Sequence, residues 1–105
     1  MELPRLTDSE RAAALERAAQ ARKVRAQVKA ELKSGKRTLA EVIALGKSDE
    51  FIGKMKVSAL IESLPGVGKV RALAVMEKVG IAASRRIRGL GIHQTRDLLA
   101  EFQLR

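Results

Sequence analysis

The six residues Leu64-Pro65-Gly66-Val67-Gly68-Lys69 constrain the fold of this chain more than any other segment. They separate two apolar, helix-compatible runs, residues 57–64 and residues 69–79. The proline ends the first run because it lacks the N–H that a helix interior requires. Both glycines can adopt a positive φ, and neither has a side chain that would hold a ligand away from the backbone. We therefore expect two helices joined by a tight turn with an accessible backbone.

The turn and the start of the second helix are suited to a phosphate group. The first N–H groups of a helix have no partner within it, and the positive end of the helix dipole lies beside them. Helix N-termini of this kind bind phosphate, and two cationic side chains follow the turn directly. The first candidate binding residues are therefore Pro65, Gly66, Val67, Gly68, Lys69 and Arg71.

The overall charge indicates a polyanionic partner. Lysine and arginine number 21 against 12 aspartate and glutamate residues, and the pI is near 10.7. A small protein this basic usually meets DNA, RNA or an anionic membrane. The plain alternative is a basic domain whose charges are only solvated. Phe51 and Phe102 are the only aromatic residues, which argues against single-strand binders that stack bases on aromatic rings.

Missing residue types argue against several other classes of protein. The chain has no cysteine, and so no disulfide framework and no thiolate metal site; a reducing cytosol is the simplest compartment. His93 is the only histidine, which leaves no histidine cluster for a metal and no catalytic triad. We expect no enzyme activity and no cofactor. No apolar run is long enough to span a bilayer, and the first helix has too few large apolar residues to insert into one.

The first 35 residues read as a helical arm. Thr7 and Glu10 have the spacing of a capping box, and residues 8–33 contain neither glycine nor proline. The face made by small apolar residues is thin before Ala21 and thicker after it, so we expect only the second half to pack. That half also carries a cationic cluster of five residues, Arg22, Lys23, Arg25, Lys29 and Lys33. This cluster is either a solvated face, a set of phosphate contacts or part of a weak coiled coil.

Residues 36–105 read as a small helical core. A second capping box, Thr38 with Glu41, starts a helix that Gly46 ends as a C′ residue. A short helix over residues 49–55 follows, with Lys54 and Lys56 near its end as candidate phosphate contacts. After the two helices around the turn, residues 82–91 are too rich in glycine and arginine to indicate a helix, and a last helix is expected over residues 93–102. No segment alternates as a strand does, so the predicted fold is all-α.

Three arginines form a second candidate site. Arg85, Arg86 and Arg88 surround one apolar residue, Ile87, and Gly89 follows them. If Ile87 points inward, the guanidinium groups point outward, where each can bind two phosphate oxygens. The alternative is a solvated loop, or arginines that pair with acidic residues of the chain itself: Glu62, Glu77 or Glu101.

These motifs resemble known nucleic-acid-binding modules. The turn followed by Ala72 is similar to the helix-hairpin-helix motif, which implies contacts with nucleic-acid backbones and not with bases. The order helix, glycine-rich turn, helix, second turn, last helix resembles the helix-two-turns-helix module, including that of the head protein of the small ribosomal subunit. Over its whole length the chain resembles the actinobacterial integration host factor family, on the motifs Leu3-Pro4, Thr7, Arg11-Ala12-Ala13-Ala14-Leu15-Glu16, Gly53-Lys54-Met55-Lys56-Val57-Ser58-Ala59-Leu60 and residues 85–91.

The resemblance implies a nucleoid-associated architectural protein that binds and bends duplex DNA with little sequence preference and serves site-specific recombination. It implies that the hairpin faces the minor groove and that the three arginines hold phosphates. Pro65 then has two interpretations, a helix terminator and an apolar wedge that deforms the duplex. We expect a monomer, because no spare apolar face is obvious.

Two rival functions are open at this point. A ribosomal or tRNA-associated RNA-binding protein would use the same helix-two-turns-helix module, although the ribosomal relative typically ends in a long basic tail. A DNA glycosylase-lyase is the other, since Met1-Glu2-Leu3-Pro4 faintly resembles the start of those enzymes. There the N-terminal proline amine is the nucleophile, whereas the nitrogen of Pro4 is an amide.

Overall fold

The computed structural model describes residues 7–103, so the motifs in residues 1–4 lie outside the described range. Within that range the chain is all-α, as predicted, and contains no strand. The elements are α1 (Asp8–Ser34), α2 (Leu39–Leu45), α3 (Glu50–Gly53), α4 (Val57–Glu62), α5 (Lys69–Val79), the 3₁₀ helix η1 (Ile87–Gly89) and α6 (Ile92–Gln103).

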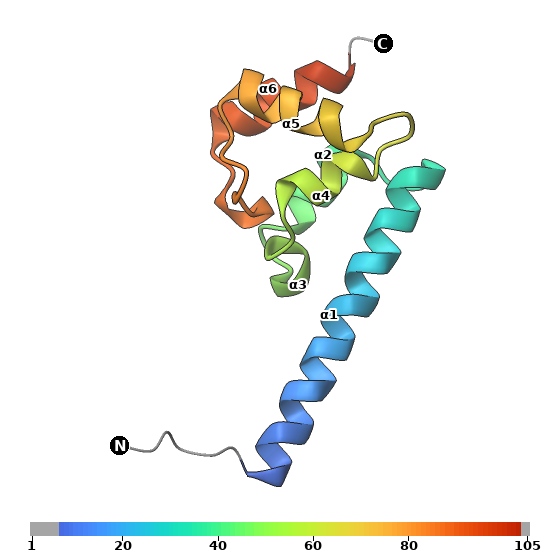
Figure 1. Cartoon of the computed structure of the whole chain (residues 1–105), viewed down its shortest axis with the longest axis vertical. Coiled ribbons are helices and arrows are strands. Elements are labelled where there is room, and N and C mark those ends of the chain that lie inside the picture. Colours follow the sequence, from blue (N-terminus) through green and yellow to red (C-terminus); the bar gives the residue numbers. More distant parts are fainter. Residues whose placement is uncertain (1–6, 104–105) are drawn as a thin grey trace.

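Helix α1 is a long arm that packs through its C-terminal half. Both bonds of the predicted capping box form at Thr7 and Glu10. Val28 and Leu32 are buried, while every side chain from residue 8 to residue 20 is exposed. Figure 1 shows the N-terminal half extending well beyond the remaining helices, which gives the molecule its extents of 53 × 32 × 25 Å. Burial along α1 is thus confined to the half that begins at Ala21, but Arg17 of the first half also contacts the core, where it pairs with Glu50 and its guanidinium carbon lies 5.8 Å from the centre of the Phe51 ring.

The other helices enclose one small core. Helix α4 packs on α5, α5 packs on α6, and α2 contacts both α3 and α6. The innermost side chains have essentially no exposed surface and come from five of these elements and from α1: Leu32, Val42, Val57, Leu60, Ile61, Ala72, Ile87 and Leu98. Burial of this apolar set is the main favourable term holding the short helices together, because none of them is long enough to be stable alone.

Two predicted helices are shorter than expected. Asp49 is the N-cap of α3, and its carboxylate accepts hydrogen bonds from the Phe51 and Ile52 N–H groups. The helix ends at Gly53 because Met55 turns away to pair with the chain near residue 87. Helix α4 ends at Glu62, since the next two N–H groups bond three residues back and residue 64 precedes a proline, which disfavours helical φ and ψ.

Among residues 7–103, no helix has the length and apolar character needed to cross a membrane.

Candidate nucleic-acid interface

The hairpin turn, residues 65–68, joins α4 to α5. Gly66 adopts φ +77°, the left-handed conformation that was predicted to need a glycine. Gly68 does not: its φ of −93° and ψ of −179° are extended, so a positive φ is not the reason for this glycine. Val67 is buried and anchors the turn, while Pro65 is exposed. The backbone around both glycines is open, because a Cβ added at either would meet no atom within 4 Å.

The N-terminus of α5 has no side-chain cap. Gly68 is the N-cap residue and has no side chain to offer, and no side chain caps this end of the helix. Lys69 is exposed beside it. The N–H groups of the first turn, together with this ammonium group, therefore present positive charge at the open side of the hairpin turn. This arrangement is suited to one phosphate group.

Two residues of α5 differ from the expected arrangement. Arg71 is half-buried, and its guanidinium carbon lies 6.0 Å from the centre of the Phe102 ring. It therefore packs between α5 and α6, and it does not line the cleft beside the turn. Val70 was read as part of the apolar run of α5, yet it is 84% exposed.

The arginine loop, residues 85–89, is fixed to the core through Ile87. That side chain is fully buried, and Leu90 is nearly so, which confirms the inward anchor inferred from the sequence. The Ile87 N–H donates to the Met55 carbonyl, and the Val57 N–H donates to the Arg85 carbonyl, at 2.9 and 3.0 Å. These two bonds tie the loop to the junction between α3 and α4, the segment that carries Lys54 and Lys56.

Two glycines allow this close packing. A Cβ on Gly46 would lie 2.3 Å from Ile87 Cγ2, and a Cβ on Gly53 would lie 2.6 Å from the Gly46 carbonyl oxygen and 3.2 Å from Arg88 Cβ. Gly46 does follow α2, as predicted, but its φ is −64° and not left-handed. Its absent side chain makes room for the arginine loop.

Arg85 and Arg86 are each held by a backbone carbonyl. Arg85 Nη1 donates a hydrogen bond to the Gly89 carbonyl at 3.0 Å. The Arg85 side chain also lies against Gly89, because a Cβ added to Gly89 would be 3.2 Å from Arg85 Cδ. Arg86 Nη1 donates to the Lys54 carbonyl. Arg86 and Arg88 are exposed. Within residues 7–102 none of the three forms an ion pair with a carboxylate. Internal neutralisation by acidic residues, the alternative considered for them, is therefore absent from the described part of the chain.

Lys54 and Lys56 lie beside Arg86, and a carboxylate partly neutralises one of them. Glu50 accepts from Lys54 Nζ at 3.0 Å and from Arg17 Nη2 at 2.6 Å. The hydrogen bond from Lys54, followed by that from Arg17, lowers the pKa of Glu50 below its usual value. Lys56 is exposed and has no such partner among residues 7–102.

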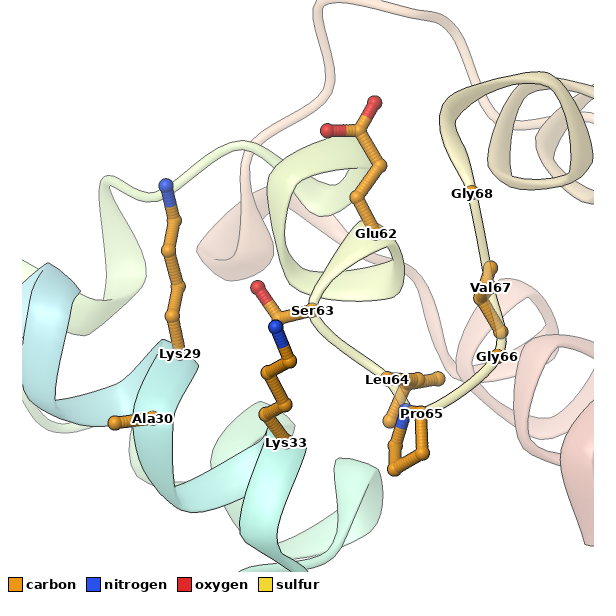
Figure 2. A pocket seen from close by; sticks show the side chains of 10 residues that line it. All are labelled: Lys29, Ala30, Lys33, Glu62, Ser63, Leu64, Pro65, Gly66, Val67 and Gly68. Carbon is orange, nitrogen blue, oxygen red and sulfur yellow. The ribbon is translucent and has the colours of Figure 1, made fainter.

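A cleft of about 540 Å³ opens between the hairpin turn and α1. Figure 2 shows the turn from Pro65 to Gly68 along one side and the side chains of Lys29 and Lys33 along the other. Glu62 also lines it. The sequence placed the two lysines on a helix whose contact with nucleic acid was left open, and gave no sign that they face the hairpin turn.

Comparisons with known proteins agree with this geometry. Residues 32–102 match the family described as the S13-like H2TH domain. Integration host factor of Streptomyces coelicolor is 60% identical over 102 residues, which are 97% of this chain and 95% of that protein. Integration host factor of Mycobacterium tuberculosis is 55% identical over 102 residues, 97% of each chain.

A solved structure of sIHF bound to an 8 bp palindromic DNA superposes with a TM-score of 0.81. It shares 59% sequence identity and covers 83% of this chain and 98% of its own. On identity, coverage and fold together, the chain belongs to the integration host factor family of actinobacteria, built on an S13-like helix-two-turns-helix domain.

Proposed function

We propose that this protein binds duplex DNA with little sequence preference and acts as an architectural protein of the nucleoid. Residues 36–105 form the DNA-binding core and residues 1–35 the arm. The observation that carries the proposal is a pair of outward-facing sites on one small core. One is the uncapped N-terminus of α5 beside an open turn; the other is a loop whose arginines have no acidic partner among residues 7–102. A relative 59% identical to this chain is bound to DNA.

The two sites hold the duplex by its phosphates. The N–H groups after Gly68 and the ammonium group of Lys69 bind one phosphate, and Arg86, Arg88 and Lys56 bind others. Contacts to phosphate fix the position of a protein on the duplex but carry no sequence information. Binding is therefore almost independent of sequence, falls steeply with salt, and varies with how easily the DNA deforms.

Bending follows from the exposed Pro65 at the tip of the turn. An apolar ring pressed into the minor groove unstacks or widens it and deforms the duplex. Deformation of this kind suits compaction of the chromosome and assistance to a site-specific recombinase acting on the same DNA. The protein performs no chemistry on DNA, and its place is the nucleoid in the cytoplasm.

The test is fluorescence anisotropy on three unrelated duplexes, with Arg86→Gln and the matched control Arg96→Gln. Arg96 lies on α6 and pairs with Asp97. Arg86→Gln weakens binding to all three duplexes by the same factor and reduces the magnitude of the negative slope of log K against log salt by about 0.9, the value of one phosphate contact. Arg96→Gln leaves both quantities unchanged. One duplex that loses far more affinity than the others, or structured RNA that competes as well as duplex DNA, contradicts the proposal.

A further inference from the structure

A four-residue repeat in the second half of α1 pairs an apolar residue with a cation three times. The pairs are Val24-Arg25, Val28-Lys29 and Leu32-Lys33. Residues four apart lie on one face of a helix. The repeat therefore makes two adjacent stripes, one apolar and one cationic, along residues 24–33 of α1.

The apolar stripe fixes the direction of the cationic stripe. Val28 and Leu32 are buried in the core, and Val24 packs against it. Because each cation directly follows a buried anchor, the cationic stripe runs along one border of the contact between α1 and the core. Neither Lys29 nor its two neighbours in the stripe form an ion pair with any carboxylate of residues 7–102.

Two clefts meet along this border. The first lies between α1 and the hairpin turn and is lined by Lys29 and Lys33 (Figure 2). The second, of about 290 Å³, lies between α1 and the junction of α3 and α4, next to the arginine loop. Its basic lining residues are Arg25, Lys29, Lys54, Lys56 and Arg86. Lys29 lines both, so the two clefts adjoin at this side chain, and together they are called the groove below.

The groove is strongly cationic. Six of its lining residues are basic and one is acidic, Glu62. Low-dielectric walls on both sides concentrate the positive potential of such a groove and attract a polyanion.

We propose that the cationic stripe of α1, which consists of Arg25, Lys29 and Lys33, is a third phosphate-binding element that spans the space between the hairpin turn and the arginine loop. Its occupant is the sugar-phosphate backbone of duplex DNA, so the inference rests on the proposed function. At a rise of 1.5 Å per residue, the stripe covers about 12 Å of helix axis. One strand of B-DNA presents a phosphate every 3.4 Å along its axis, so this length spans about three to four intervals between consecutive phosphates.

The stripe also explains why the chain attaches α1 to this particular edge of the core. A helix that served only as a spacer would need the apolar stripe alone. Here the anchor residues place three cations at intervals of about 6 Å beside two other phosphate sites. The second half of α1 is thus part of the interface, while the exposed first half is the projecting arm.

The test compares Lys29→Gln with Lys23→Gln in the intact protein. Lys23 belongs to the same helix and the same cationic cluster of the sequence, but it lines neither cleft. Both changes remove one charge, and glutamine is as good a helix former as lysine. Circular dichroism and thermal melting verify that both variants fold as the wild type does.

Lys29→Gln reduces the magnitude of the negative slope of log K against log salt by about 0.9. With equal affinities at 1 M salt, this corresponds at 0.1 M to roughly eightfold weaker binding to duplex DNA. Lys23→Gln changes the affinity less than twofold. Equal effects of the two variants overturn the inference, because the charge of α1 would then act only through the long-range field. Wild-type protein that does not bind DNA overturns the proposed function itself, whereas a response to Arg86→Gln without one to Lys29→Gln overturns only the role of α1.

Discussion

Gly68→Ala separates the folding role of the hairpin turn from its binding role. Gly68 is extended, and a Cβ added there meets no atom within 4 Å, so the folded protein accepts alanine without a clash. Lower backbone entropy of the unfolded chain stabilises the variant by about 0.4–1 kcal/mol. Alanine is a poorer N-cap than glycine, which costs roughly the same amount. The free energy of unfolding therefore changes by no more than about 1 kcal/mol.

Binding responds differently, because the added methyl group occupies the open side of the turn where a phosphate approaches the backbone. Loss of one hydrogen bond to a charged group costs about 1.5–3 kcal/mol, equivalent to roughly a tenfold to hundredfold loss of affinity. Urea denaturation measures the first quantity, and fluorescence anisotropy with a duplex measures the second. We expect a stable protein that binds DNA weakly.

Gly35→Ala is the matched control for this experiment. Gly35 is also open to solvent, but its φ of +81° strains any other residue, so the variant loses stability of about 1 kcal/mol. It lies at the end of α1 and lines neither cleft of the groove. Under conditions in which both variants are folded, Gly35→Ala binds DNA as the wild type does. Gly68→Ala with wild-type affinity would refute the claim that a phosphate sits against the turn.

Two further variants test the support of the arginine loop and the carboxylate beside it. Ile87→Ala empties a fully buried site and lowers the free energy of unfolding by about 2–5 kcal/mol, measured by urea denaturation; a cost below 1 kcal/mol would show that the loop is not anchored there. Glu50→Gln frees Lys54 for a phosphate and raises DNA affinity at pH 7. The hydrogen bonds from Lys54 and Arg17 lower the pKa of Glu50, so the wild type keeps this carboxylate charged until the pH falls through the lowered pKa, where the two proteins converge. Equal affinities of the variant and the wild type at pH 7 would show that Glu50 does not keep Lys54 from a phosphate.

The parts of the fold that the sequence predicted well are those set by short-range interactions. The capping boxes at Thr7 and Thr38 each involve residues three apart, and both form. The all-α fold followed from helical periodicity, and the anchor at Ile87 followed from one apolar residue among three arginines.

The parts that could not be predicted depend on contacts between distant segments. Gly46 follows α2, as its local sequence indicated, but its contact with Ile87, 41 positions away, could not be predicted from that sequence. The pairing of Arg17 with Glu50 is of the same kind, since 33 residues separate them. Such contacts follow only from the packing of α1 and the arginine loop on the core.

The candidate site shows the same division. The hairpin turn and the arginine loop were recognisable because each is a continuous motif. Arg71 was assigned to the hairpin site by its position in sequence, but the helix turns it towards Phe102. Lys29 was one of five similar cations in α1, and only the direction of the buried face separates it from Lys23.

The central claim is that the hairpin turn and the arginine loop grip one duplex together. Amide chemical shifts of the ¹⁵N-labelled protein, followed by NMR during titration with a short duplex, test it most directly. We expect the amides of residues 66–69 and 85–89 to shift in the same titration and to give one common Kd. Shifts confined to one of the two segments, or two segments that saturate with different Kd values, would contradict the account.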